Sequence, residues 1–142
     1  MKAFREAIES WDFEAVEKLL ADDVVFTSPV AFKPYPGKAI TAAILRGVSR
    51  VFTDFHYLRE INDEPHSALV FEAKVGDSTV NGCDFITVNG DGLISELTVM
   101  VRPLKAAHAL ADAMGAQFEQ IQAEAIASVQ NAAAAVGQGA NS

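Results

Sequence analysis

The part of the sequence that most restricts the fold is residues 55–101, where apolar and polar side chains alternate through four successive segments. Such alternation is typical of strands with one buried face. Turn-forming residues separate the segments at 62–65, 76–77 and 89–92. The Gly-Asp pair at 76–77 is typical of a tight hairpin, because Gly accepts the positive φ that the first turn position demands. The sequence therefore predicts an antiparallel meander.

Helical spacing precedes this meander. Residues 1–21 repeat apolar side chains on one face, which predicts two helices joined by a tight corner at Asp12. The Asp12 side chain can cap the second helix by accepting from the free amides of its first turn. A short strand over 24–28 and a proline-rich loop over 29–37 then lead into a third helix. A sheet covered by helices on one face is an α+β arrangement, and its curling leaves a cone that can enclose a ligand.

The C-terminal part of the chain is again helical in pattern. We predict a domain over 1–103, a C-terminal helix over 104–128 and a flexible tail over 129–142, which is rich in Ala, Gly and Asn. The apolar stripe of the predicted helix packs either on the mouth of the cone or on a partner subunit.

Charge and composition exclude several classes of function. The net charge of −8, from 11 basic and 19 acidic residues without a basic stripe, disfavours nucleic acid and anionic membranes as partners. No apolar run approaches the ~20 residues of a membrane helix, and residues 1–6 become polar too early for a secretory signal. The single cysteine, Cys83, indicates a reducing cytoplasm, and the three histidines lack metal-ligand spacing. A small, mostly apolar molecule remains as the expected partner.

Asp84 is the residue with the clearest chemical signal. Strand alternation places it on one face with Val80, Ile86 and Val88. If that face lines the cone, loss of water raises the pKa of the carboxyl and makes it a proton donor or an acid–base group. The alternative is structural: Asp84 hydrogen-bonds a nearby amide or hydroxyl, or the face points outward.

Three short motifs resemble one superfamily. Residues 20–29 (LADDVVFTSP), the Pro36-Gly37 helix entry and residues 89–94 (NGDGLI) resemble the NTF2-like superfamily, and within it the SnoaL-like and ketosteroid-isomerase-like branch. The resemblance covers about residues 1–103. It implies an NTF2-like cone of curved antiparallel sheet packed on three helices, an internal apolar pocket, no cofactor, and a homodimer formed through the outer sheet face.

The resemblance also assigns positions for comparison with ketosteroid isomerases. In those enzymes an Asp directly before the strand-ending proline is the general base, and the matching residue here is Ser28. A tyrosine on the first helix supplies a hydrogen-bond donor, and the matching residue here is Phe4. A protonated Asp on the penultimate strand falls at Asp84. With one match in three, the standard steroid isomerase mechanism is not expected. SnoaL-like cyclases also use an Asp from the sheet, which is the closer analogy for Asp84.

Further residues are predicted around the same site. His56 is a potential base partner of Asp84, although its facing depends on strand register, and Tyr35, between two prolines, can donate a hydrogen bond from the pocket rim. Alternation groups Tyr57 with Phe55 and Ile61. The residues predicted to contact the ligand are Phe4, Trp11, Phe26, Ser28, Tyr57, Phe71, Ile86, Leu97 and Val99.

Two functions follow as hypotheses. The first is a SnoaL-like protein that binds a small apolar, carbonyl-bearing molecule, with cofactor-independent acid–base chemistry of the cyclase or isomerase type at Asp84. The second is a non-catalytic NTF2-like module for ligand binding or dimerisation. In either case the outer-face residues predicted to form a dimer are Cys83, Phe85, Thr87, Thr98 and Met100.

Overall fold

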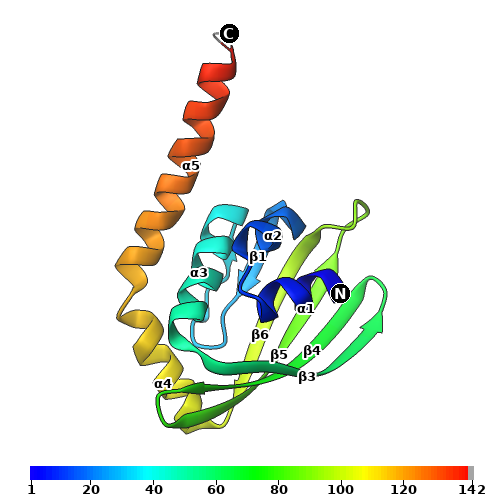
Figure 1. Ribbon diagram of the computed structural model, residues 1–142, viewed down its shortest axis with the longest axis vertical. Helices are drawn as coiled ribbons and strands as arrows, with labels where there is room; N and C mark the ends of the chain where they lie inside the picture. The colour runs from blue at the N-terminus through cyan, green and yellow to red at the C-terminus, as the bar shows by residue number, and fades with distance from the viewer. Residues whose placement is uncertain (141–142) are drawn as a thin grey trace.

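The computed structural model describes residues 1–140, with side chains through residue 132, and these form five helices and one curved sheet (Figure 1). The end of the predicted tail, residues 141–142, lies outside the described residues. The helices are α1 (Lys2–Glu9), α2 (Phe13–Leu19), α3 (Lys38–Val51), α4 (Leu104–Gly115) and α5 (Phe118–Ala140). The strands are β1 (Leu20–Thr27), β2 (Tyr35–Pro36), β3 (Thr53–Asp63), β4 (His66–Val75), β5 (Ser78–Val88) and β6 (Ile94–Arg102).

The corner between α1 and α2 forms as its sequence predicts. Asp12 is the N-cap of α2, and its carboxylate accepts a hydrogen bond from the amide of Ala15 at 3.2 Å. The amide of Asp12 in turn donates to the carbonyl of Ala7, at the end of α1. Trp11 takes a left-handed backbone conformation (φ 53°) between the two helices, which reverses the chain within a few residues.

The predicted meander is confirmed. The sheet has the order β2-β1-β6-β5-β4-β3, and β3 to β6 pair as antiparallel neighbours. Gly76 and Asp77 form the two-residue hairpin between β4 and β5, and Gly76 has a φ of +57°. β1 joins the free edge of β6 in parallel, while the short β2 protects the outer edge of β1.

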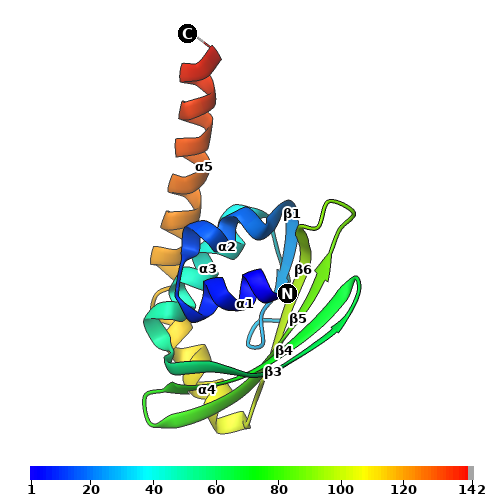
Figure 2. The ribbon, with the colours of Figure 1, turned by 45° about the vertical axis from the view of Figure 1, so that its right-hand side comes forward.

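The helices gather on one side of the sheet. In Figures 1 and 2, α1, α2 and α3 cover the concave face, while most of α5 projects away from the body of the molecule. Buried apolar side chains from both layers form one continuous core, including Phe4, Leu69, Phe71, Ile86 and Leu97. The arrangement confirms the predicted α+β cone of curved sheet packed on three helices, and the one parallel pairing among the described strands is that of β1 with β6.

A bulge in β3 changes which residues face the core. Tyr57 pairs with Phe71, but Arg59 pairs with Val70, so one extra residue of β3 is inserted at Leu58. Such a bulge reverses the alternation after it. Tyr57 is therefore buried whereas Ile61 is 58% exposed on the outer face. The prediction that Ile61 shares a face with Tyr57 is wrong for this reason.

The C-terminal segment forms two helices where the sequence pattern predicts one. α4 ends at Gly115, and the amide of Gln117 donates to the carbonyl of Met114, which tightens the last turn. The side chain of Gln117 donates to the carbonyl of Gly47 on α3 at 2.8 Å. α5 then runs beside α3 and continues to Ala140, well past the predicted helix end at 128.

Gly82 provides a test of how the side chains pack on the concave face of the sheet. It lies opposite Phe71 in the sheet, and a Cβ at this position would lie 2.6 Å from Cε1 and 2.8 Å from Cε2 of the Phe71 ring. That ring is itself confined, since Phe55 stacks on it at 5.0 Å and Phe52 lies at 5.8 Å. Gly82 is therefore needed for close approach and not for an unusual backbone conformation.

We predict that Gly82→Ala lowers the free energy of unfolding by about 1–3 kcal/mol, because the added methyl group overpacks a confined core. Urea denaturation measures this change. The control is Gly90→Ala in the turn between β5 and β6, where a Cβ meets no atom within 4 Å and the expected change is about 0.5 kcal/mol or less. Increased stability of Gly82→Ala would contradict the packing described here.

Candidate functional site

The concave face of the sheet and the helices that cover it surround a cavity of about 210 Å³. Strands and helices between Phe4 and Ile121 contribute to its wall, which is almost entirely apolar. α3 supplies Ile44, Leu45 and Val48, and α4 supplies Leu110 and Met114. Such a lining favours an apolar molecule, with its orientation fixed by the few polar groups present.

Most residues predicted for the site lie around this cavity. Asp84 lines it together with Tyr35 from the rim. The predicted contact residues that also line it are Phe4, Trp11, Phe26, Ser28, Tyr57, Phe71 and Val99.

Three predicted residues lie elsewhere. Ile86 and Leu97 pair with each other across β5 and β6 and are at most 1% exposed in the core, so they do not line the cavity. His56 lies on the outer face of β3, where its Nδ1 is 3.0 Å from the carbonyl oxygen of Asp54 and its Nε2 is 4.0 Å from Glu72. Because the imidazole is on the opposite face of the sheet from the cavity, it is not a partner of Asp84.

The partner of Asp84 is Tyr57. The Tyr57 hydroxyl donates a hydrogen bond to Oδ2 of Asp84 at 2.6 Å, and both residues are buried. The two strands that carry them are separated by β4, where Phe71 pairs with Tyr57 and Leu69 pairs with Asp84. Within residues 1–132, no second donor reaches the Asp84 carboxyl. The site is thus a buried hydroxyl–carboxyl pair in an apolar wall.

Burial determines the charge state of this pair. Loss of water raises the pKa of Asp84 to about 7, although the hydrogen bond from Tyr57 acts in the opposite direction. Burial, followed by the negative charge of Asp84, raises the pKa of Tyr57 well above its ordinary value. Tyr57 therefore stays protonated at neutral pH, whereas Asp84 exchanges between its acid and its carboxylate.

An aromatic cluster fixes the position of Tyr57. The rings of Phe55 and Phe71 meet the Tyr57 ring edge to face, at 5.0 Å and 6.3 Å between centroids. Trp11 lies 5.4 Å from Phe55 and connects the cluster to the corner between α1 and α2. Phe52 and Phe55 line the cavity as well, and sequence reasoning did not include them among the ligand contacts.

The rim of the cavity is formed by the loop after β1 and by the last two helices. Oγ of Ser28 accepts a hydrogen bond from the amide of Val30 at 3.1 Å, which orients this side chain in the loop. The ring of Tyr35 lies between Phe26 at 6.5 Å and Phe118 at 6.2 Å. Phe118 belongs to α5, which shows that the C-terminal helices take part in the cavity.

The described residues offer no metal site: no three His, Cys, Asp or Glu side chains gather within them. Over the same part of the chain, no helix has the length and apolar character to cross a membrane.

Comparisons with known proteins identify the family. Residues 1–97 match the family model of the SnoaL-like domain. A steroid delta-isomerase from Pseudomonas aeruginosa is 37% identical, with a TM-score of 0.79 over 84% of this chain and 89% of its own. An uncharacterized bacterial protein with a cystatin-like fold from Silicibacter pomeroyi is 35% identical, with a TM-score of 0.79 over 87% of this chain and 92% of its own.

A more distant structure shares the fold alone. It is an NTF2-like protein of unknown function from Cytophaga hutchinsonii, 17% identical, with a TM-score of 0.57 over 71% of this chain and 85% of its own. A search of the curated proteins gives no match. The matched model covers most of the chain from its first residue, and the chain belongs to the SnoaL-like domain family of the NTF2-like superfamily.

Proposed function

We propose that the protein binds a small apolar molecule with a carbonyl group in its internal cavity and transfers a proton through Asp84. The observation that carries this proposal is the Tyr57–Asp84 pair, buried in an otherwise apolar wall. A carbonyl oxygen is the complementary group, because it accepts a hydrogen bond without bringing a charge into the cavity.

The pair has the properties that such chemistry needs. A group with a pKa of about 7 is present as acid and as base at neutral pH, which is the most effective range for proton transfer. Protonated Asp84 donates to the carbonyl oxygen, and ionised Asp84 accepts a proton from the carbon beside the carbonyl. The 37% identity to a steroid delta-isomerase supports a ketone as the ligand. Ser28 and Phe4, which replace the usual base and donor, support a mechanism different from the standard isomerase.

A non-catalytic binding module is the second candidate. Two observations favour it: Phe4 brings no donor into the cavity, and Ser28 offers a hydroxyl, a much weaker base than a carboxylate. In this case Asp84 and Tyr57 would orient a ligand and perform no proton transfer. Ligand binding is common to both candidates, and catalysis separates them.

We further propose that the outer face of the sheet forms a homodimer. Ile61, Ala68, Phe85 and Thr98 are successive neighbours across β3 to β6, and Cys83 and Met100 pair beside them. Ile61 and Met100 are each 58% exposed and Phe85 is 43% exposed. A contiguous apolar strip of this kind on a sheet face is typical of a protein interface.

The raised pKa of Asp84 predicts that stability depends on pH. As pH rises from about 4 to 7, the unfolded chain releases the Asp84 proton while the folded protein retains it, so the free energy of unfolding falls. Asp84→Asn removes this dependence. The free energy of unfolding of the variant, minus that of the original chain, should therefore increase by about 4 kcal/mol from pH 4 to pH 8.

Urea denaturation at a series of pH values measures this difference. Asp91→Asn is the matched control, because Asp91 lies in the exposed turn before β6 and its substitution should leave the pH profile unchanged. Parallel stability curves for Asp84→Asn and the original chain would show that the Asp84 carboxyl titrates normally.

A further prediction concerns the binding of 2-acetylnaphthalene, an apolar two-ring ketone. Its affinity should decrease about tenfold as pH rises through 7, because the Asp84 carboxyl loses the proton it donates. Asp84→Asn should bind without this pH dependence. Quenching of Trp11, the one tryptophan of the chain, measures binding at the cavity. Glu96→Gln on the exposed face of β6 should retain the pH dependence, and its loss in that control would point away from Asp84.

The same probe separates catalysis from binding alone. If Asp84 acts as a base, the methyl protons beside the carbonyl exchange with deuterium in D₂O, with an acceleration of about 10²–10⁴-fold from a positioned base. Proton NMR follows the exchange, which Asp84→Asn should abolish. Binding without accelerated exchange would favour the non-catalytic module.

The proposed dimer has its own test. Sedimentation velocity at micromolar concentration should show a dimer for the original chain and a monomer for Met100→Glu, because a charge placed in an apolar interface is not solvated. Ile126→Glu alters an equally exposed apolar residue on α5 and should leave the dimer intact. A monomeric original chain would refute this assembly.

A further inference from the structure

The helices beyond the matched domain supply part of the cavity wall. The family match ends at residue 97, and α4 begins at Leu104. The side of the cavity contributed by α4 and α5 consists of Leu110, Ala111, Met114, Gly115, Phe118 and Ile121. The hydroxyl–carboxyl pair, by contrast, comes from β3 and β5 within the matched domain.

We propose that the α4–α5 pair is the size filter of the cavity, with Met114 and Phe118 as its specificity-determining side chains. This inference rests on the proposed binding of an apolar ketone and adds to it the part of the protein that limits the size of the ligand. Because the wall is apolar, it discriminates by the volume of the hydrocarbon body and leaves carbonyl recognition to Tyr57 and Asp84.

Phe118 completes a row of rings along the cavity. Phe26 on β1, Tyr35 on β2 and Phe118 on α5 follow one another at 6.5 Å and 6.2 Å between centroids, and all three line the cavity. Removing the Phe118 side chain opens this row at α5. The backbone of the sheet and the aromatic cluster around Tyr57 are not part of this change.

The wall is placed by close packing of α5 on α3. A Cβ on Gly47 would lie 2.8 Å from Cδ1 of Ile121 and 3.3 Å from Cε of Met114, so the absence of a side chain at Gly47 permits the contact. Gln117 donates to the carbonyl of the same glycine at 2.8 Å. The wall residues Met114 and Ile121 are therefore held in fixed positions against α3.

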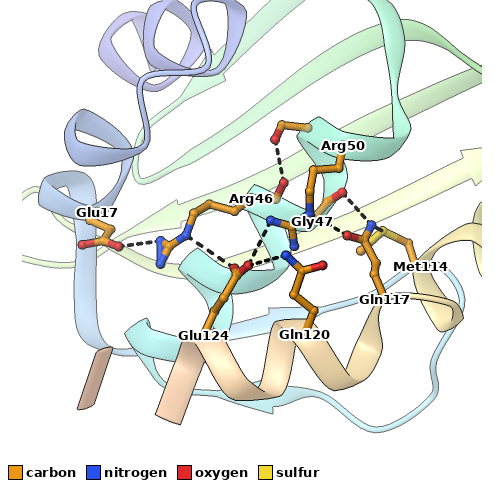
Figure 3. Close-up of polar contacts among 9 residues, drawn as sticks. Glu17, Arg46, Gly47, Arg50, Met114, Gln117, Gln120 and Glu124 are labelled. Atoms are coloured by element: carbon orange, nitrogen blue, oxygen red, sulfur yellow. Dashed lines mark hydrogen bonds and ion pairs between the residues drawn. The ribbon is translucent and has the colours of Figure 1, made fainter. Parts of the chain in front are cut away.

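A polar cluster between α3 and α5 attaches α5 to α3 at a second place (Figure 3). Oε1 of Glu124 accepts hydrogen bonds from Arg50 at 3.0 Å and from Gln120 at 3.1 Å. Arg50 also donates to the side chain of Gln117 at 2.7 Å. These bonds hold the first turns of α5 against α3 at the level where Phe118 enters the cavity.

Arg46 extends the cluster to α2. Its Nη1 donates to Glu17 at 2.9 Å, and its Nε lies 3.8 Å from the buried Oε2 of Glu124. Arg46, Arg50 and Glu124 are 25%, 35% and 27% exposed, so solvent screens these ion pairs less than ordinary surface pairs. Glu124 contacts no part of the cavity and acts as a positioning residue for the wall.

The test uses three ketones of increasing size: acetophenone, 2-acetylnaphthalene and 2-acetylphenanthrene, with one, two and three rings. Calorimetry gives the ratio of the Kd of the three-ring ketone to that of the one-ring ketone. Phe118→Ala should lower this ratio about tenfold or more, because the enlarged cavity admits the larger body and contacts the smaller one less. Leu104→Ala is the control, since Leu104 lies on α4 but is 74% exposed and outside the lining.

Ala111→Leu tests the wall in the opposite direction. The larger side chain reduces the cavity and should raise the same ratio, which also covers the case in which Phe118→Ala does not fold. Glu124→Gln removes the charge that holds α5 and should lower the ratio about threefold. Its matched control is Glu14→Gln, which removes an exposed charge on α2, away from the wall.

The outcomes separate a failure of the size filter from a failure of the proposed ketone binding. If the original chain binds none of the three ketones, the proposed ligand class is wrong and the size filter is overturned with it. If it binds them and the ratio stays constant in Phe118→Ala and Ala111→Leu, the ligand class stands and the size filter is overturned. A ratio that changes in those variants but not in Glu124→Gln would overturn the positioning role of Glu124.

Discussion

The hydrogen bond between the Tyr57 hydroxyl and the Asp84 carboxyl is the interaction on which the site depends, since it is formed where water is excluded. In water the carboxyl would be ionised at neutral pH and the hydroxyl would bind solvent, and both groups would have ordinary pKa values. Within the cavity wall, burial raises the pKa of Asp84 to about 7 and keeps Tyr57 protonated. The proton transfer that we propose for this protein therefore depends on the desolvation of one ordinary carboxyl.

The rest of the fold creates that environment. Curvature of the sheet brings β3 and β5 to face the same enclosed space, and the bulge at Leu58 lets Tyr57 point inward while Ile61 points outward. Gly82 gives room to the Phe71 ring, which meets the Tyr57 ring edge to face at 6.3 Å. Each of these features is a packing property, and together they determine the protonation state of the site.

The cavity has two structural origins. The matched SnoaL-like domain provides the polar pair and most of the aromatic wall, while α4 and α5 provide the side that we propose limits ligand size. Because the same superfamily fold serves unrelated functions, variation in such a wall is a physically simple way to change the ligand while the fold persists.

The sequence alone determined the order of helices and strands, the hairpin at Gly76, the cap at Asp12 and the isolation of Asp84 among apolar residues, because these depend on neighbours along the chain. It did not determine the break between α4 and α5 or the outward position of His56 and Ile61. The bulge at Leu58 reverses the alternation before Ile61, and the pairing of β3 with β4 sets the face of His56. α4 ends at a tight turn where the Gln117 side chain donates to the carbonyl of Gly47 on α3. The Tyr57–Asp84 pair was also left to the tertiary structure: its residues lie 27 positions apart on strands separated by β4, so only the register of three strands brings them together.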